Sequence, residues 1–123
     1  MKFINYIIFL AFIFTIPSCV QESYVRHIKV TLDVSALDSI NSVGIRGKGL
    51  PLSWQTDYPM QELVKDSLYT AFITTTTGYK FGECKFTVNG DFELKGEDNR
   101  RVYFAESDTT YYHAVFGIAK DSE

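Results

Sequence analysis

The chain has 123 residues, of which 46% are hydrophobic and 22% are charged, and its formal net charge is −3. This balance is typical of one globular domain, and the length is too short for a (β/α)₈ barrel, which needs about 250 residues. A slightly acidic chain offers no basic footprint for a nucleic acid, so no nucleic-acid partner is expected.

The N-terminal residues have the pattern of a secretory signal peptide. Lys2 supplies the positive end, and residues 6–16 form a nearly continuous apolar run. Such a run is short for a membrane-spanning helix, which needs about 20 residues, but it suits the core of a signal peptide. The following Ile16-Pro17-Ser18-Cys19 resembles the lipobox of bacterial lipoproteins, although Pro17 is less usual at its position. The alternative is an ordinary secretory signal that contains a cysteine.

The lipobox resemblance implies that residues 1–18 are removed and that Cys19 is lipidated. Several acyl chains would hold the protein firmly on a membrane, since a single chain binds only marginally. Val20 provides no inner-membrane retention signal of the Asp type, so the outer membrane of a bacterial cell envelope is favoured, with the facing side left open. A lipidated Cys19 would leave Cys84 no disulfide partner. Cys84 alternates with Phe86 and is interpreted as a buried small hydrophobe.

Beyond the signal, the pattern predicts strands. Residues 19–25 are expected to form the lipidated cysteine and a tether, 26–119 a single domain, and 120–123 a C-terminal tail. In the first strand, apolar residues at 28, 30, 32 and 34 alternate with polar ones, and a period of two is typical of a half-buried strand. Further strands are predicted at residues 43–47, 60–64, 68–75, 79–88, 92–94, 101–105 and 110–118.

The spacing of turns indicates how these strands are arranged. Asn89-Gly90 is a strong signal for a type I′ hairpin. Turn signals recur about every 8–12 residues, which is typical of antiparallel sandwiches, and no segment after the signal shows a helical apolar stripe. We therefore predict an all-β fold: an immunoglobulin-like antiparallel β-sandwich of seven to eight strands.

The sequence contains no recognisable catalytic or metal-binding motif. His27 and His113 lie on different predicted strands, and neither H-E-x-x-H nor G-x-S-x-G occurs. Gly44, Gly47 and Gly49 precede no helix, so they are interpreted as strand-end and turn residues rather than a phosphate cradle. We expect a protein that is not an enzyme and that has no metal and no cofactor.

Residues 43–104 contain a series of short motifs in a characteristic order. The order resembles the starch-binding domains of carbohydrate-binding module family 20 and their relatives, over about half of the chain. Three departures stand out: Phe92 replaces a Trp, Cys84 replaces an aromatic residue, and the gap from Glu93 to Asn99 is two residues longer. The motifs are Val43-Gly44-Ile45-Arg46-Gly47, Leu50-Pro51-Leu52-Ser53-Trp54, Asp66-Ser67-Leu68-Tyr69, Glu83-Cys84-Lys85-Phe86, Phe92-Glu93-Leu94 and Asn99-Arg100.

The resemblance implies a set of sugar-contacting residues. Trp54 and Phe92 match the two aromatic residues that stack on glucose rings in the family. Polar side chains at the rim of such a platform would hydrogen-bond the sugar hydroxyls. Tyr69 matches an aromatic residue of the family's second site, in a looser alignment. The polar members of the predicted set are Lys85, Glu93 and Asn99.

These features predict a non-catalytic lipoprotein that binds starch or another α-glucan. Its expected partners are the polysaccharide, the membrane that holds Cys19, and a separate glycan-processing enzyme or envelope protein. The alternative is a structural or protein-interaction module of the cell envelope that keeps the sandwich without a sugar site. In that interpretation Trp54 packs in the core or over a sheet edge, and Lys85 is an ordinary outward-facing residue.

Overall fold

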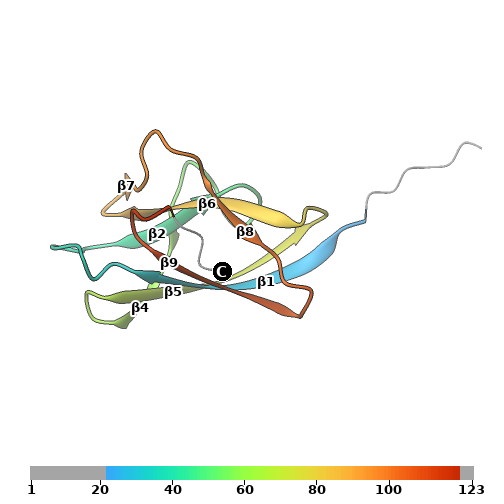
Figure 1. The fold of residues 1–123 in the computed structure, drawn as a ribbon, viewed down its shortest axis with the longest axis horizontal. Helices are drawn as coiled ribbons and strands as arrows, with labels where there is room; N and C mark the ends of the chain where they lie inside the picture. The colour runs from blue at the N-terminus through green and yellow to red at the C-terminus, as the bar shows by residue number, and fades with distance from the viewer. Residues whose placement is uncertain (1–21, 120–123) are drawn as a thin grey trace, which may run out of the picture.

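The computed structural model describes residues 22–119, which form two facing β-sheets and contain no helix (Figure 1). The predicted signal peptide 1–18, the lipidation site Cys19 and the tail 120–123 lie outside the described residues. The first strand begins at Tyr24, two residues before the predicted start of the domain. The predicted all-β sandwich is therefore confirmed for the described part of the chain.

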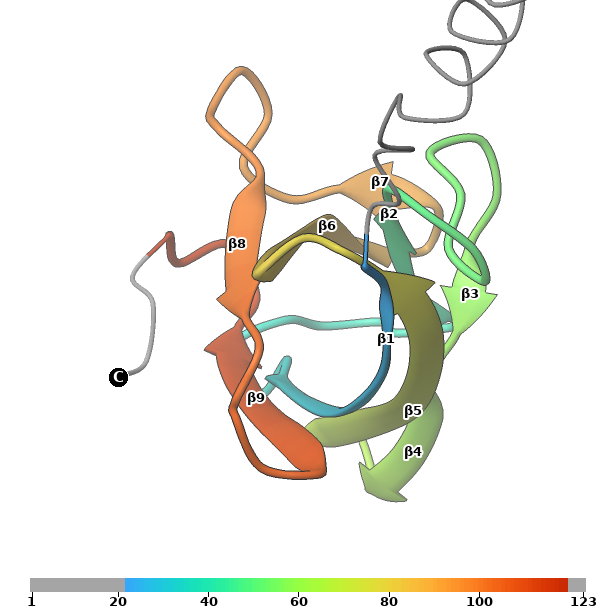
Figure 2. The ribbon, with the colours of Figure 1, turned by 90° about the vertical axis from the view of Figure 1, so that its right-hand side faces the viewer.

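One layer, here called the β1 sheet, has the strand order β4-β5-β1-β9. The other layer, here called the β6 sheet, has the order β3-β2-β6-β7, and β8 also pairs with β6. Seen from the end where β1 begins, β6 and β7 lie above the core and β4 and β9 lie below it (Figure 2). The strands are β1 (Tyr24–Asp33), β2 (Val43–Gly47), β3 (Tyr58–Pro59), β4 (Gln61–Val64), β5 (Leu68–Thr77), β6 (Phe81–Val88), β7 (Asp91–Phe92), β8 (Arg100–Tyr103) and β9 (Thr109–Val115).

Two details of the architecture differ from the sequence prediction. The described residues contain nine strands rather than seven or eight, because the two-residue β3 is too short to produce an alternating pattern. Not every pair is antiparallel, since β9 runs parallel to β1, with His27 opposite Thr109. Alternation assigns residues to a face of a sheet but carries no information about the direction of the neighbouring strand.

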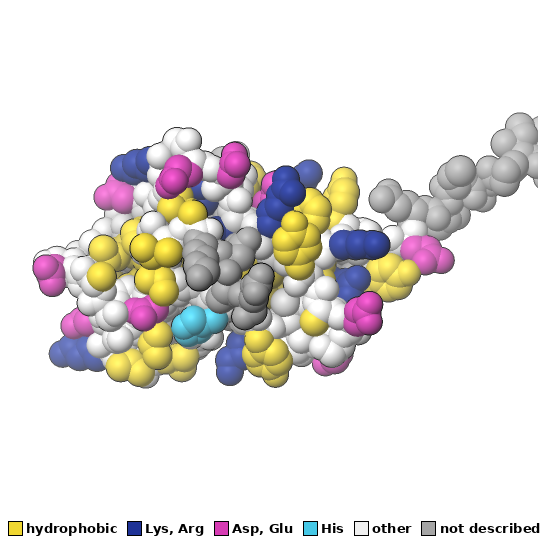
Figure 3. Space-filling view, in the orientation of Figure 1, with side chains coloured by type: hydrophobic (Ala, Val, Ile, Leu, Met, Phe, Trp, Pro, Cys, Tyr) yellow, Lys and Arg dark blue, Asp and Glu magenta, His cyan; other side chains and the backbone are white. Residues whose placement is uncertain are grey.

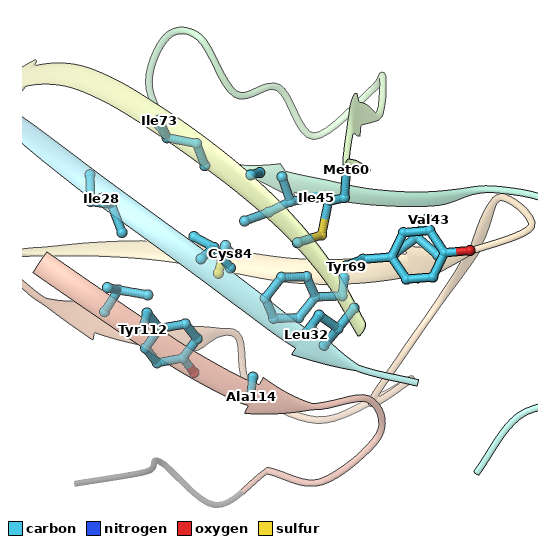
Figure 4. Packing of buried hydrophobic residues seen from close by; sticks show 14 of the residues in the cluster. Ile28, Leu32, Val43, Ile45, Met60, Tyr69, Ile73, Cys84, Tyr112 and Ala114 are labelled. Atoms are coloured by element: carbon cyan, nitrogen blue, oxygen red, sulfur yellow. The ribbon is translucent and has the colours of Figure 1, made fainter. Parts of the chain in front are cut away.

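The core lies between the sheets and follows the predicted alternation. Ile28 and Leu32 of β1 and Ile45 of β2 lie in the space between the sheets (Figure 4). Val30 and Phe86 belong to the same buried cluster, and each of these five residues is at most 5% exposed. Burial of such side chains supplies the main favourable term for folding, at roughly 25 cal/mol per Å² of apolar surface.

The turns connect the strands in two ways that matter for the site. Asn89 and Gly90 both have positive φ, 53° and 80°, which is the backbone of the predicted type I′ hairpin between β6 and β7. The chain passes from the β6 sheet to the β1 sheet at Met60, which separates β3 from β4 and is buried. The loop before this crossover contacts both sheets: Leu50 accepts a hydrogen bond from Thr75 of β5, whereas Trp54 and Asp57 accept from Arg46 on the outer face of β2.

Candidate functional site

The outer face of the β6 sheet gathers several of the predicted site residues. Cys84 and Phe86 point into the core, so the alternate residues of β6, Lys85 and Thr87, point outward. In the register, Arg46 lies opposite Lys85, and Thr87 lies opposite Phe92. Directly opposed side chains share one face, so these four residues form a continuous outer surface.

Arg46 connects this surface to the loop that carries Trp54. Its Nε donates to Asp57 Oδ1 at 2.7 Å, and its Nη1 donates to the Trp54 carbonyl at 3.3 Å. The guanidinium also lies over the Phe92 ring, 4.8 Å from the ring centroid, in cation–π geometry. Trp54 is half-buried, and its backbone carbonyl is the atom that joins it to Arg46. We call Arg46, Trp54, Asp57, Lys85 and Phe92 the Arg46 face.

A second hydrogen bond fixes the Asp57 carboxylate against the outer face of the β6 sheet. Thr87 Oγ1 donates to the same Asp57 Oδ1 at 2.9 Å. The approach requires Gly44, because a Cβ there would lie 2.7 Å from the Asp57 Cβ and 2.9 Å from Thr87 Oγ1. Sequence reasoning missed Arg46 and Asp57. The one available signal was that Arg46 alternates with the inward-facing Ile45, which places a charge on the outer face.

The ammonium group of Lys85 is hydrogen-bonded to a loop. Its Nζ donates to the carbonyls of Leu94 and Glu97, at 2.9 and 2.7 Å, which fixes the segment between β7 and β8. An ammonium has three donors, so one N–H remains for a ligand. Asn99 is exposed near the end of the same segment. It lines a polar groove of about 660 Å³ beside Glu83 and Arg101, on the β8 side of the sheet.

Glu93 does not face the surface, and its predicted contact with sugar hydroxyls is wrong. Its side chain is fully buried and forms a salt bridge with Arg100, with Arg100 Nη2 at 2.9 Å from Glu93 Oε2. The same carboxylate accepts backbone N–H bonds from Phe86 and Gly117, at 3.1 and 2.9 Å. A buried carboxylate must satisfy its oxygens internally, and these partners do so. Motif order could not reveal this, since Gly117 lies far along the chain.

Arg100 completes this buried pair. Its Nη2 also donates to the carbonyls of Val115 and Ile118, at 2.9 and 2.8 Å. Burial lowers the pKa of Arg100, but the hydrogen bonds to Glu93 and Tyr112 outweigh that effect, and the pKa is raised. The guanidinium therefore stays charged, and the pair ties β7 and β8 to the end of β9.

Tyr69 also does not lie where the resemblance placed it. It is 7% exposed, its ring packs in the core, and its hydroxyl donates to Glu62 Oε2 at 2.9 Å. Burial, together with the bond to Glu62, raises its pKa. A buried ring has no free face for a sugar, so the predicted role of Tyr69 in a second stacking site is wrong.

Within residues 22–119, no group of three or more His, Cys, Asp or Glu side chains is arranged to hold a metal ion. No helix in that part of the chain has the length and apolar character needed to cross a membrane. No protein-family model matches the chain, and comparison with curated proteins finds no match.

Proposed function

We propose that the protein is a non-catalytic glycan-binding module that uses the Arg46 face. The observation that supports it is that the Trp54 loop, Phe92, Lys85 and Arg46 meet on one side of a rigid sheet. A pyranose has an apolar face that packs on flat rings and a rim of hydroxyls that bond charged groups. A sheet holds such a platform with little ordering on binding.

Each side chain of the face has a role in this proposal. Trp54 packs against the sugar ring. Arg46 covers one side of Phe92, so its planar guanidinium, rather than the Phe92 ring, would meet a second sugar there. Lys85 offers its remaining N–H, and Asp57 offers Oδ2 to hydroxyls. The resemblance to starch-binding domains, which implies an immunoglobulin-like fold, favours an α-glucan as the ligand.

The proposal includes a location. Lipidation at Cys19 would anchor the domain to a bacterial cell envelope, with the outer membrane favoured. Glycan processing would then fall to a separate enzyme in the same envelope, since no catalytic group is proposed for this chain.

The test is a titration of the purified protein with maltoheptaose and with a non-glucan oligosaccharide. Trp54 is the only tryptophan in the chain, so its fluorescence reports on the face directly. We expect a saturable change with maltoheptaose alone. Calorimetry should show that Trp54→Ala weakens binding at least about tenfold, since stacking and burial of the ring against one sugar are worth about 1.4 kcal/mol or more.

Tyr111→Ala is the matched control. Tyr111 is an aromatic residue that is 77% exposed, but it lies on the β1 sheet. It should leave maltoheptaose binding unchanged. Equal loss in both variants, or unchanged binding in Trp54→Ala, would contradict the assignment of the site.

A second candidate function is a structural or interaction module of the envelope. It is favoured because three of the predicted sugar contacts have structural roles within the domain. Glu93 and Tyr69 are buried, and Lys85 donates hydrogen bonds to two backbone carbonyls. A folded protein that binds none of the glycans, but cross-links to an envelope protein in cells, would support this candidate instead.

A further inference from the structure

A cavity of about 370 Å³ opens between the two sheets, at the end of the sandwich where β1 begins. That end of the ribbon faces the viewer in Figure 2. Its inner walls come from the core, including Ile28, Ile45, Ile73 and Val102. Small-molecule sites commonly have volumes of roughly 300–1,000 Å³ with mainly apolar walls. The Arg46 face lies on the outside of the β6 sheet, so this cavity is a separate feature.

The cavity exists because small side chains occupy the inward positions at this end. On β5 the inward series that begins with Ala71 and Ile73 continues to Thr75 and Thr77, which line the cavity. On β6 the position two residues before Cys84 is Gly82. A Cβ there would meet only the Phe104 ring, at 3.4 and 3.8 Å. Larger residues at these positions would have closed the sandwich.

One cation and three aromatic rings line the cavity, and a second cation, Arg26, packs on one of those rings. Lys48 lines the opening, and its Nζ lies 5.4 Å from the centroid of the Tyr79 ring. Arg26 follows the inward alternation of β1, and its guanidinium lies 5.4 Å from the ring of Phe104, which also lines the cavity. In Figure 3, hydrophobic and basic side chains lie next to one another at this right-hand end, and some acidic side chains lie among them.

The Arg26 side chain has one buried hydrogen-bond donor without a partner among the described residues. Its Nη1 donates to the Ala105 carbonyl at 3.3 Å, but its Nε is buried and has no hydrogen-bond partner among the described residues. Buried donors are normally satisfied, and an exception calls for an explanation. Across residues 22–119, neither Arg26 nor Lys48 takes part in an ion pair. Glu22 accepts from Tyr24, and Glu83, which itself lines the cavity, has its carboxylate 4.0 Å from Arg101.

We propose that this cavity binds the hydrocarbon tail of a single-chain anionic amphiphile, such as a fatty-acid carboxylate. The tail lies against the apolar walls, where its burial is favourable. The acidic head group stays at the mouth, within reach of Lys48 and Arg26. An uncharged tail would gain only the first of these interactions, and a cationic amphiphile would be repelled at the mouth.

The test uses the mature chain, residues 19–123, with Cys19→Ser, which prevents lipidation and avoids detergent. Octanoate, decanoate and dodecanoate are titrated below their micellar concentrations, and the isoleucine methyl groups are followed by NMR. Burial of each methylene should tighten binding about fourfold, so decanoate should bind about 15-fold more tightly than octanoate. The methyl signals of Ile28, Ile45 and Ile73 should shift, whereas that of exposed Ile118 should not.

Two variants separate the contribution of the hydrocarbon tail to binding from that of the head group. Gly82→Leu fills the cavity and should weaken dodecanoate binding at least about tenfold. Lys48→Glu should weaken dodecanoate but not dodecyltrimethylammonium. Lys29→Glu, an exposed charge reversal on the outer face of the β1 sheet, is the control and should change neither.

Three results would overturn the proposal. One is saturation without shifts of the cavity methyls. Another is the absence of any chain-length dependence. The third is binding only to anionic phospholipid vesicles and not to dissolved carboxylates, which would instead assign the basic, aromatic end to a membrane surface.

Discussion

At the scale of single residues, the Arg46 face depends on an absent side chain. Gly44 leaves the space in which Asp57 lies against the sheet, bridging Arg46 and Thr87. The sequence interpretation of Gly44 as a strand-end glycine was incomplete, because it lies within β2 and its role is a close approach. Glycine in a strand interior weakens the strand, so its presence marks a place where another group must come near.

Tyr69 makes a residue-scale prediction about pH. Its pKa is raised in the folded protein, so the unfolded chain loses this proton first as the pH rises. The contribution of the raised pKa to stability is therefore complete below about pH 10, the usual tyrosine value, and is lost above it as the folded pKa is reached. Tyr69→Phe should remove that part of the alkaline loss and should cost about 1 kcal/mol at neutral pH, because Glu62 loses a donor.

Urea unfolding between pH 8 and 11.5 measures this difference. Tyr111→Phe, at an exposed position, should follow the unsubstituted protein at every pH. If Tyr69→Phe also kept the full alkaline decline, the buried hydroxyl would not be its source.

At the scale of elements, the sequence predicted what depends on neighbouring residues. The alternation of Ile28, Val30 and Leu32 defined β1 and its buried face, and Asn89-Gly90 defined a hairpin. The parallel pairing of β9 with β1 depends on chain segments far apart, and no local pattern encodes it. The same holds for the site. Trp54, Lys85 and Phe92 came from motifs, but the burial of Glu93 depends on Arg100 and on the end of β9.

The β6–β7 hairpin allows a prediction that separates two contributions of Asn89. Its positive φ is costly for most residues, and its side chain also holds the segment before β2. Oδ1 accepts from the N–H groups of Asn41 and Ser42, at 2.7 and 3.1 Å, and Nδ2 donates to the Ser39 carbonyl at 2.9 Å. Asn89→Ala loses the bonds and adds backbone strain, so we expect about 2–3 kcal/mol of destabilisation.

Asn89→Gly provides the matched comparison for this position. Glycine adopts the same φ without strain, so this variant should lose only the hydrogen bonds and be about 1 kcal/mol more stable than Asn89→Ala. Urea unfolding of the three proteins measures both terms. Equal stability of the two variants would show that the φ angle carries no cost here.

At the scale of the whole molecule, one buried ion pair joins the two sheets. Glu93 follows β7 and binds the N–H of Phe86, both in the β6 sheet region, and it also binds Gly117 just after β9. Arg100 binds the carbonyls of Val115 and Ile118 on either side of Gly117. The end of the β1 sheet is thus fastened to the loop that Lys85 supports, and the outer face of the β6 sheet depends on this connection.

The pair should behave as a unit. Removal of one partner leaves a buried charge without compensation, so Glu93→Gln and Arg100→Met should each destabilise the protein by about 3–5 kcal/mol. The double variant Glu93→Gln with Arg100→Met leaves no buried charge, and its cost should fall below the sum of the two single costs by at least about 2 kcal/mol. Arg101→Ala removes an exposed partner 4.0 Å from Glu83 and should cost under about 1 kcal/mol.

A double-mutant cycle by chemical denaturation gives these values, and simple additivity would contradict the coupling. Glu93 also bears on the glycan proposal, because the starch-binding resemblance implies that it contacts a sugar. Since its carboxylate is fully buried, Glu93→Gln should change maltoheptaose affinity only as far as it loosens the loop held by Lys85. At a low temperature, where the variant is fully folded, its affinity should therefore lie close to that of the unsubstituted protein, whereas Trp54→Ala should remain weak. A persistent loss in Glu93→Gln would return that carboxylate to the binding surface.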